Sequence, residues 1–170
     1  MIQKKICLLG APAVGKTSLV TRFVQSIFSE KYLTTVGVKI DKKTVNVSGT
    51  EVTLVLWDLA GESDFQHLEM SYLRGASGYL LVADGTRGKT LDKAVELQTR
   101  VSASLGSVPF VFVINKADLT EEWEIAAGRL SELSSAGWTI RSSSAKDGTG
   151  VNEIFSELAW VMAGGRRADV

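Results

Sequence analysis

Apolar and polar residues follow two alternating patterns along the chain, one typical of helices and one typical of strands. Apolar residues recur at helical spacing in four stretches, which predict helices over 15–26, 90–105, 121–135 and 151–162. Short alternating or continuous apolar runs predict strands over 2–9, 36–47, 52–57, 78–83, 109–114 and 138–142. Strands separated by helices of this length are typical of a mostly parallel sheet covered on both faces. The pattern therefore predicts an α/β fold.

Two local signals refine the boundaries of these elements. The turn residues Ser48 and Gly49 separate the second and third strands, which predicts a hairpin. Thr120 precedes the third helix and is expected to be its N-cap, because a threonine hydroxyl can accept a hydrogen bond from a free N–H of the first turn.

Length and composition indicate one domain spanning residues 1–170, with 45% apolar and 22% charged residues. Lys+Arg and Asp+Glu both number 19, and this zero net charge argues against a nucleic-acid partner. One cysteine and one histidine exclude an intramolecular disulfide and a zinc cluster of Cys and His. A chain without disulfides is expected in the cytoplasm. The first apolar run is too short for a secretory signal, and no run approaches a membrane span, so we expect no direct membrane anchor in this chain.

The first chemical motif is a phosphate loop at 10–17, with the sequence GAPAVGKT. It fits G-x-x-x-x-G-K-[ST] and lies between a predicted strand and a predicted helix, and composition alone would produce about 0.02 such matches. The glycines allow successive N–H groups to point at phosphate oxygens, at a helix N-terminus that favours anions. Lys16 is expected to reach the β- and γ-phosphates, and the Thr17 hydroxyl to ligate Mg²⁺. The predicted phosphate-binding residues are Ala13, Val14, Gly15, Lys16, Thr17 and Ser18.

The second motif, Asn115-Lys116-Ala117-Asp118, indicates which base the bound nucleotide carries. It follows the buried strand 109–114, and ligands of open α/β sheets bind at such carboxyl ends. The Asp118 carboxylate can accept two hydrogen bonds from the N1–H and 2-amino groups of guanine, which adenine does not offer. A phosphate-loop kinase or ATPase is the alternative class, and Asp118 argues against it.

The pattern D-x-x-G occurs twice, at Asp58–Gly61 and at Asp147–Gly150, and is weak by itself. Asp58 ends an apolar strand, where it is expected to hold Mg²⁺ through water, and the Gly61 N–H to contact a γ-phosphate. Asp147 precedes the last helix and is interpreted as a turn or cap residue.

With these motifs, the chain resembles a Ras-superfamily small GTPase over essentially its whole length. The segments 32–38 (YLTTVGV) and 57–61 (WDLAG) are most similar to the Rab-type branch. The resemblance implies a three-layer P-loop GTPase domain, with a six-stranded, mostly parallel sheet, one antiparallel edge strand and five helices. It also implies GTP and GDP as ligands, Mg²⁺ as cofactor, and effector, exchange factor and activating protein as partners at two switch regions.

Further site residues follow from the resemblance alone. Thr35 is expected to ligate Mg²⁺ and sense the γ-phosphate, with Thr34 as the competing candidate. Phe28 is expected to pack against guanine, although core packing is the default for an isolated aromatic residue. The segment Ser144-Ala145-Lys146 resembles the last guanine-contacting loop, with the Ala145 N–H facing the base oxygen.

Two positions depart from the family pattern. Glu62 stands where the family usually has the glutamine that orients the attacking water. An ionised Glu62 cannot donate a hydrogen bond to the γ-phosphate, which predicts slow intrinsic hydrolysis; the alternative is that Glu62 points to solvent. Pro12, which has no N–H, is expected to stiffen the phosphate loop or to restrict a partner's arginine. His67 in the second switch region is interpreted as a surface or partner-contact residue rather than an acid or base.

The main hypothesis is a Mg²⁺-dependent switch that hydrolyses GTP to GDP, and the alternative is a GTP-bound interaction module without hydrolysis. The catalytic residues of the first hypothesis are Lys16, Thr35, Gly61 and Glu62. The last predicted helix ends close to Val170, which leaves no room for a lipidated tail. We therefore expect either a truncated chain or a relative without an anchor, with a prokaryotic origin among the candidates.

Overall fold

The computed structural model describes residues 2–25, 38–59 and 70–165. In these residues one six-stranded sheet has the strand order β2-β3-β1-β4-β5-β6. The strands are β1 (Ile2–Gly10), β2 (Val38–Val47), β3 (Thr50–Leu59), β4 (Gly78–Asp84), β5 (Phe110–Asn115) and β6 (Ile140–Ser142). The edge strand β2 is antiparallel to β3, and the other strand pairs are parallel. The prediction of a mostly parallel sheet with one antiparallel edge strand is confirmed.

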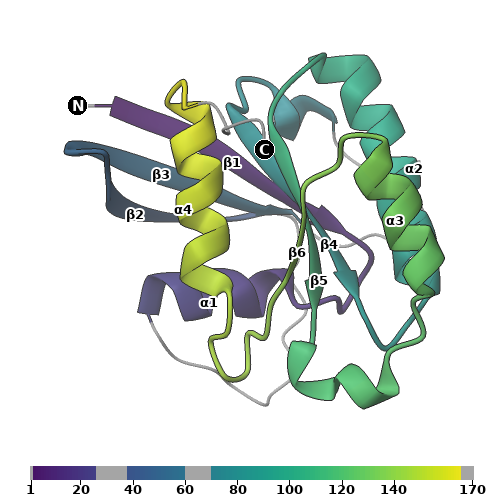
Figure 1. Cartoon of the computed structure of the whole chain (residues 1–170). Helices are drawn as coiled ribbons and strands as arrows, with labels where there is room; N and C mark the ends of the chain where they lie inside the picture. The colour runs from purple at the N-terminus through teal and green to yellow at the C-terminus, as the bar shows by residue number, and fades with distance from the viewer. Residues whose placement is uncertain (1, 26–37, 60–69, 166–170) are drawn as a thin grey trace.

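Helices cover both faces of this sheet (Figure 1). The α-helices of the described residues are α1 (Lys16–Gln25), α2 (Lys89–Leu105), α3 (Ala127–Ser135) and α4 (Val151–Met162), and the 3-10 helices are η2 (Met70–Leu73) and η3 (Ala117–Glu122). Helices α1 and α4 pack against one face, and α2 and α3 against the other. This three-layer arrangement agrees with the predicted fold class. Among the residues placed in the structure, no helix combines the length and the apolar character that crossing a membrane requires.

The two hydrophobic cores follow from the alternation of side chains along the central strands. Ile6 and Leu8 of β1 join the core under α1 and α4, whereas Cys7 and Leu9 join the core under α2. A strand buried on both faces needs apolar residues at every position, and this is why β1 and β4 have continuous apolar runs.

The hairpin predicted from Ser48 and Gly49 is present. These two residues connect β2 to β3 and have φ angles of 50° and 86°. Two successive positive φ values define the tight turn that matches the twist of paired strands. The Gly49 N–H also donates to the Asn46 side chain at 2.9 Å.

The prediction for the third helix was wrong at its start. Instead of one helix over 121–135 capped by Thr120, the chain forms η3, then a short extended segment, and then α3 from Ala127 with Ala126 as its N-cap residue.

Contacts of Trp123 and Glu124 explain this break. Trp123 is extended (φ −69°, ψ 134°), and its indole N–H donates to the Lys116 carbonyl at 2.9 Å. Its ring lies against Gly85, where an added Cβ would overlap the indole. The Glu124 N–H donates to the Gly85 carbonyl at 2.8 Å. Tertiary contacts with the β4–α2 loop therefore override the local helical pattern.

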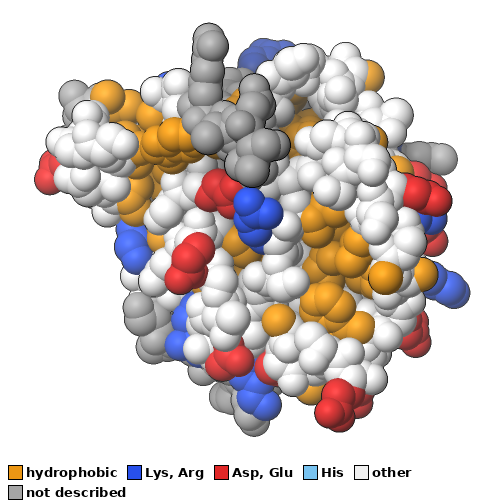
Figure 2. Space-filling view, viewed as in Figure 1, with side chains coloured by type: hydrophobic (Ala, Val, Ile, Leu, Met, Phe, Trp, Pro, Cys, Tyr) orange, Lys and Arg blue, Asp and Glu red, His pale blue; other side chains and the backbone are white. Residues whose placement is uncertain are grey.

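Charges of both signs are interspersed on the molecular face seen in Figure 2. Lys and Arg side chains of the described residues lie among Asp and Glu side chains there, as the balanced composition of 19 basic and 19 acidic residues would suggest.

Candidate functional site

The carboxyl ends of the parallel strands meet at one edge of the sheet (Figure 1). The loop 11–15 follows β1, the loop 85–88 follows β4, and the segments beginning at 116 and 143 follow β5 and β6. A crevice of an α/β sheet forms at such an edge. The structure therefore brings together the motifs that the sequence separates.

The phosphate loop adopts a conformation that only particular residues allow. Gly15 has φ +102°, and a Cβ there would overlap the Asn115 side-chain nitrogen. At Gly10 an added Cβ would overlap the Val82 carbonyl oxygen. Ala13 also has a positive φ, +66°. The two motif glycines are thus required by close approaches to β4 and β5, as well as by the bend of the loop.

Lys16 lies inside the loop and is 6% exposed. Its Nζ donates to the carbonyls of Gly10 and Ala11, both at 3.1 Å. Burial lowers the pKa of Lys16 to about 8, although the charge of Asp58 opposes the shift. The loop therefore holds a desolvated amine beside its own N–H groups, which is suited to binding an anion.

Thr17 and Asp58 provide paired oxygen atoms next to Lys16. The Thr17 hydroxyl donates to the Asp58 carboxylate at 2.5 Å, and Asp58 is fully buried at the end of β3. Hydroxyl and carboxylate oxygens are the ligands that Mg²⁺ prefers, so this pair fits the predicted metal. The second D-x-x-G match behaves as a turn, since Asp147 accepts the Thr149 N–H at 2.8 Å.

Asn115 connects the phosphate loop to the loop after β6. Its side-chain NH₂ donates to the Val14 carbonyl at 3.0 Å. Its side-chain oxygen accepts the Ser143 hydroxyl at 3.1 Å and the Ala145 N–H at 3.2 Å. Sequence reasoning assigned Asn115 to guanine only and missed this bridge, because the bridge depends on the strand order.

Asp118 lies in the first turn of η3 and is exposed at the same edge of the sheet. The buried Ser144 donates its hydroxyl to an Asp118 oxygen at 2.9 Å, which orients the carboxylate. Arg22 of α1 donates to the Ala145 carbonyl at 2.8 Å and to the Lys146 carbonyl. The sequence contains no signal for Arg22, because its partners lie in a distant loop.

Lys116 and Asp84 form an ion pair between neighbouring strand ends. Lys116 is left-handed (φ 71°), and its Nζ lies 2.7 Å from an oxygen of the fully buried Asp84. Asp84 also accepts the Thr86 N–H at 2.9 Å and the Arg87 Nε–H at 3.0 Å. Burial raises the pKa of Asp84, but hydrogen bonds from Lys116, Thr86 and Arg87 outweigh it and hold the pKa below its usual value.

We predict that Asp84→Asn lowers the free energy of unfolding at pH 7 by about 1–3 kcal/mol, because it leaves charged donors without their carboxylate. A carboxyl group whose pKa is lower in the folded state stabilises the fold above its unfolded pKa of about 3.8, and this contribution is lost as pH falls through the folded pKa. Urea unfolding at pH 7, 5 and 3 should show the difference from wild type shrinking only at the lowest pH.

The exposed Asp92, which pairs with Arg129 at 3.1 Å, offers a matched control. Asp92→Asn should change stability by less than about 0.5 kcal/mol at each pH. A difference for Asp84→Asn that is the same at pH 7 and pH 3 would contradict the prediction.

Several predicted residues lie outside the described part of the chain. They are Phe28, Thr34, Thr35, Gly61, Glu62 and His67.

The fold and site together define a class of protein. A phosphate loop with a buried lysine, a hydroxyl–carboxylate pair and an N-K-x-D segment lie at one edge of a mostly parallel sheet, as in phosphate-loop proteins that bind guanine nucleotides.

Comparison with known proteins identifies the family. The sequence model of the Ras family matches residues 5–163. The chain is 34% identical to the Ras-related protein Rab-13 of Canis lupus familiaris, over 96% of this chain and 83% of that protein. It is 35% identical to the Ras-related protein SEC4 of Saccharomyces cerevisiae, over 91% of this chain and 73% of that protein. The chain belongs to the Ras family, on its Rab-like branch, and is a GTP-binding small GTPase.

Proposed function

We propose that residues 1–170 form a single domain that acts as a Mg²⁺-dependent switch, binding GTP and GDP and hydrolysing GTP slowly without a partner. The observation that carries the proposal is the Asn115 bridge, in which one buried side chain contacts both the Val14 carbonyl of the phosphate loop and Ala145 of the base loop. Such a bridge fixes the distance between a phosphate site and a base site. The bridge therefore supports the proposal that one nucleotide occupies the phosphate site and the base site together.

At the phosphate end, the backbone N–H groups of residues 13–18 and the Lys16 amine would bind the phosphates. Thr17, Thr35 and, through water, Asp58 would hold Mg²⁺. The ion supplies charge neutralisation at the β- and γ-phosphates when bound. The hydrogen bond between the half-buried Thr17 and the fully buried Asp58 supports this assignment, because it places two suitable oxygen ligands beside Lys16.

At the base end, Asp118 would accept hydrogen bonds from the guanine N1–H and 2-amino group, with Ser144 holding the carboxylate in place. The remaining base contacts would come from Phe28, Asn115, Lys116, Ala145 and Lys146. Arg22 supports the last of these, because it fixes the carbonyls of Ala145 and Lys146.

The switch itself would depend on Thr35 and Gly61, which contact the γ-phosphate in the GTP state. Loss of that phosphate removes both contacts and changes the two switch regions. An effector would bind these regions in the GTP state, while an exchange factor would promote GDP release and an activating protein would promote hydrolysis.

This function can be tested on the nucleotide that co-purifies with the protein. We expect GDP or GTP with no adenine nucleotide, and a bound GTP that converts to GDP over time. Adenine nucleotide bound as tightly as guanine nucleotide would contradict the proposal.

We predict that Glu62→Gln raises the rate of intrinsic hydrolysis about tenfold, which corresponds to about 1.4 kcal/mol of activation free energy. Glutamine can orient water and donate a hydrogen bond, and it removes a negative charge near the phosphates. Single-turnover release of γ-phosphate from labelled GTP measures the rate.

Asp147→Asn is the matched control, since it removes one carboxylate charge from a turn and leaves the proposed chemistry intact. An unchanged rate in Glu62→Gln would remove Glu62 from the catalytic residues. If the wild-type protein releases no phosphate even with an activator, it is instead a GTP-bound interaction module.

A further inference from the structure

Arg87 in the β4–α2 loop connects the phosphate loop to the buried carboxylate that also holds Lys116. Its Nη2 donates to the Pro12 carbonyl at 2.9 Å, and its Nε donates to Asp84 at 3.0 Å. The same Asp84 oxygen lies 2.7 Å from the Lys116 Nζ. Arg87 is therefore held on one side by a buried anion, and it holds a phosphate-loop peptide on the other.

The Pro12 carbonyl belongs to the peptide whose N–H is that of Ala13. The described residues contain no cis peptide, so the carbonyl and the N–H of this unit point in opposite directions. Arg87 binds the oxygen from the β4–α2 loop, so the Ala13 N–H points away from that loop. We infer that this is the side where the phosphates would bind. The direction of this one peptide decides whether a donor or an acceptor faces the ligand.

The conformation of Ala13 shows why this peptide needs support. Ala13 has φ +66°, which its Cβ makes unfavourable, whereas a glycine would adopt it freely. Rotation of the Pro12–Ala13 peptide would relieve this strain. The rotation would also turn the Pro12 carbonyl toward the phosphates, where two negative groups would repel each other.

We propose that Arg87 is a positioning residue that holds the Pro12–Ala13 peptide with its N–H toward the phosphates and thereby slows nucleotide release. The proposal rests on the proposed function, because it assumes that a guanine nucleotide occupies this site. Pro12 is compatible with this role of Arg87. Its carbonyl accepts the hydrogen bond from Arg87, and as a proline it has no N–H that could bind a phosphate.

A merely structural Arg87 would link the β4–α2 loop to the fold without affecting the ligand. Two readouts separate these roles, the rate of GDP release and the ³¹P resonance of the β-phosphate of bound GDP. Both depend on the direction of the Ala13 N–H. A structural link would change only thermal stability.

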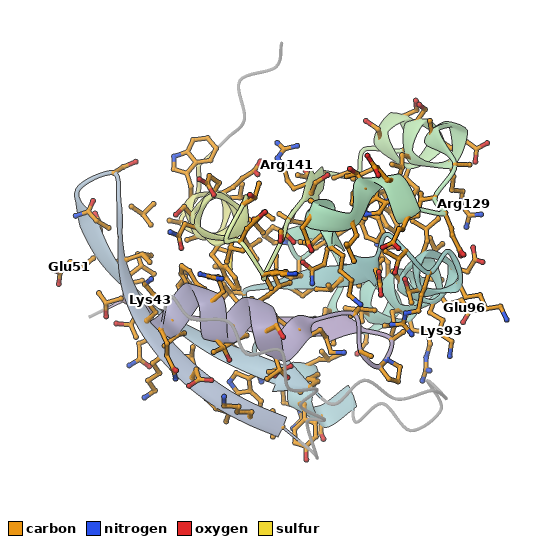
Figure 3. All side chains as sticks on the ribbon, turned by 90° about the horizontal axis from the view of Figure 1, so that it is seen from below. Lys43, Glu51, Lys93, Glu96, Arg129 and Arg141 are labelled. Atoms are coloured by element: carbon orange, nitrogen blue, oxygen red, sulfur yellow. The ribbon has the colours of Figure 1, made fainter. Side chains whose placement is uncertain are left out.

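The test compares wild type, Arg87→Ala and Arg129→Ala, each loaded with a fluorescent GDP analogue and Mg²⁺. Arg129 is a matched control, because it is 41% exposed against 45% for Arg87 and also forms an ion pair with an aspartate. Figure 3 shows Arg129 at the periphery of the molecule, on the side of Lys93 and Glu96. We expect Arg87→Ala to release the analogue about tenfold faster than wild type and to shift the β-phosphate resonance. Arg129→Ala should match wild type in both.

Inosine diphosphate, which lacks the 2-amino group, tests whether Arg87 acts through the base instead. If Arg87 acts on the phosphates, Arg87→Ala accelerates release of inosine diphosphate and GDP by the same factor. An acceleration confined to GDP would show that the effect depends on recognition of the 2-amino group of the base rather than on the phosphates, which would overturn the proposal.

Two further outcomes remain distinct. If wild type binds GDP and Arg87→Ala releases it at the wild-type rate, the role of Arg87 is refuted while the proposed function stands. If wild type binds no guanine nucleotide, the proposed function itself fails. Should Arg87→Ala not fold, Arg87→Lys keeps the charge beside Asp84 but lacks the second nitrogen of the fork; we expect release several-fold faster, and a wild-type rate would overturn the proposal.

Discussion

Asp118→Asn is expected to weaken GDP binding about a thousandfold and to create binding of xanthosine diphosphate. Two hydrogen bonds to a charged acceptor are lost, and at about 2 kcal/mol each they amount to about 4 kcal/mol. Xanthine has a carbonyl in place of the 2-amino group, and the asparagine NH₂ can donate to it. Titration calorimetry of wild type and variant with GDP and with xanthosine diphosphate measures this change in nucleotide preference.

The structure indicates that this variant keeps its fold. Asp118 is exposed, and its hydrogen bond from the Ser144 hydroxyl can be replaced by one to the asparagine oxygen. Asp147→Asn removes a similar exposed carboxylate from the turn before α4 and should change GDP binding by less than about twofold. GDP affinity that survives in Asp118→Asn would show that the base is recognised elsewhere.

The sequence predicts most of the sheet because buried strands carry their own signal. The runs at 78–83 and 109–114 appear as β4 (Gly78–Asp84) and β5 (Phe110–Asn115), each within one residue of its predicted limits. The last helix has the predicted limits, 151–162. These elements pack against a hydrophobic core. Burial therefore determines both their apolar pattern in the sequence and their position in the fold.

The third helix shows where such reasoning fails. Its composition is helical from 121, yet Trp123 is held extended by the Lys116 carbonyl and by the ring's contact with Gly85. These partners become neighbours only after the sheet has formed. No local pattern contains this information.

The residues of the candidate site also divide into those that local motifs predict and those that depend on long-range contacts. Rare motifs identify Lys16, Asn115 and Asp118 because the spacing of residues within each motif is local. The supporting contacts of Asp84 and Arg87 are not predictable from the sequence, since they depend on β4 lying between β1 and β5. The motif residues were thus visible in the sequence, whereas the residues that contact them in the structure were not.

Gly15→Ala is expected to have the largest effect on the site as a whole, because it acts on the bridge between its two halves. An alanine Cβ at Gly15 would overlap the Asn115 side-chain nitrogen, and the φ of +102° is itself unfavourable for alanine. Asn115 would have to move, which breaks its hydrogen bonds to Val14 and Ala145. We expect GDP binding to weaken at least about a hundredfold and the free energy of unfolding to fall by about 2–4 kcal/mol.

Gly137→Ala separates the strain of the backbone from the loss of the bridge. Gly137 has a similar φ of +94°, and an added Cβ there meets no atom within 4 Å. This control should cost about 1 kcal/mol of stability and leave GDP affinity unchanged. In an Asn115→Ala background, Gly15→Ala should cost no more stability than Gly137→Ala, because the overlapping nitrogen is gone. If Gly15→Ala costs the same stability with and without Asn115, backbone strain at Gly15 rather than displacement of Asn115 explains the cost, and the role of Gly15 in protecting the Asn115 bridge is refuted.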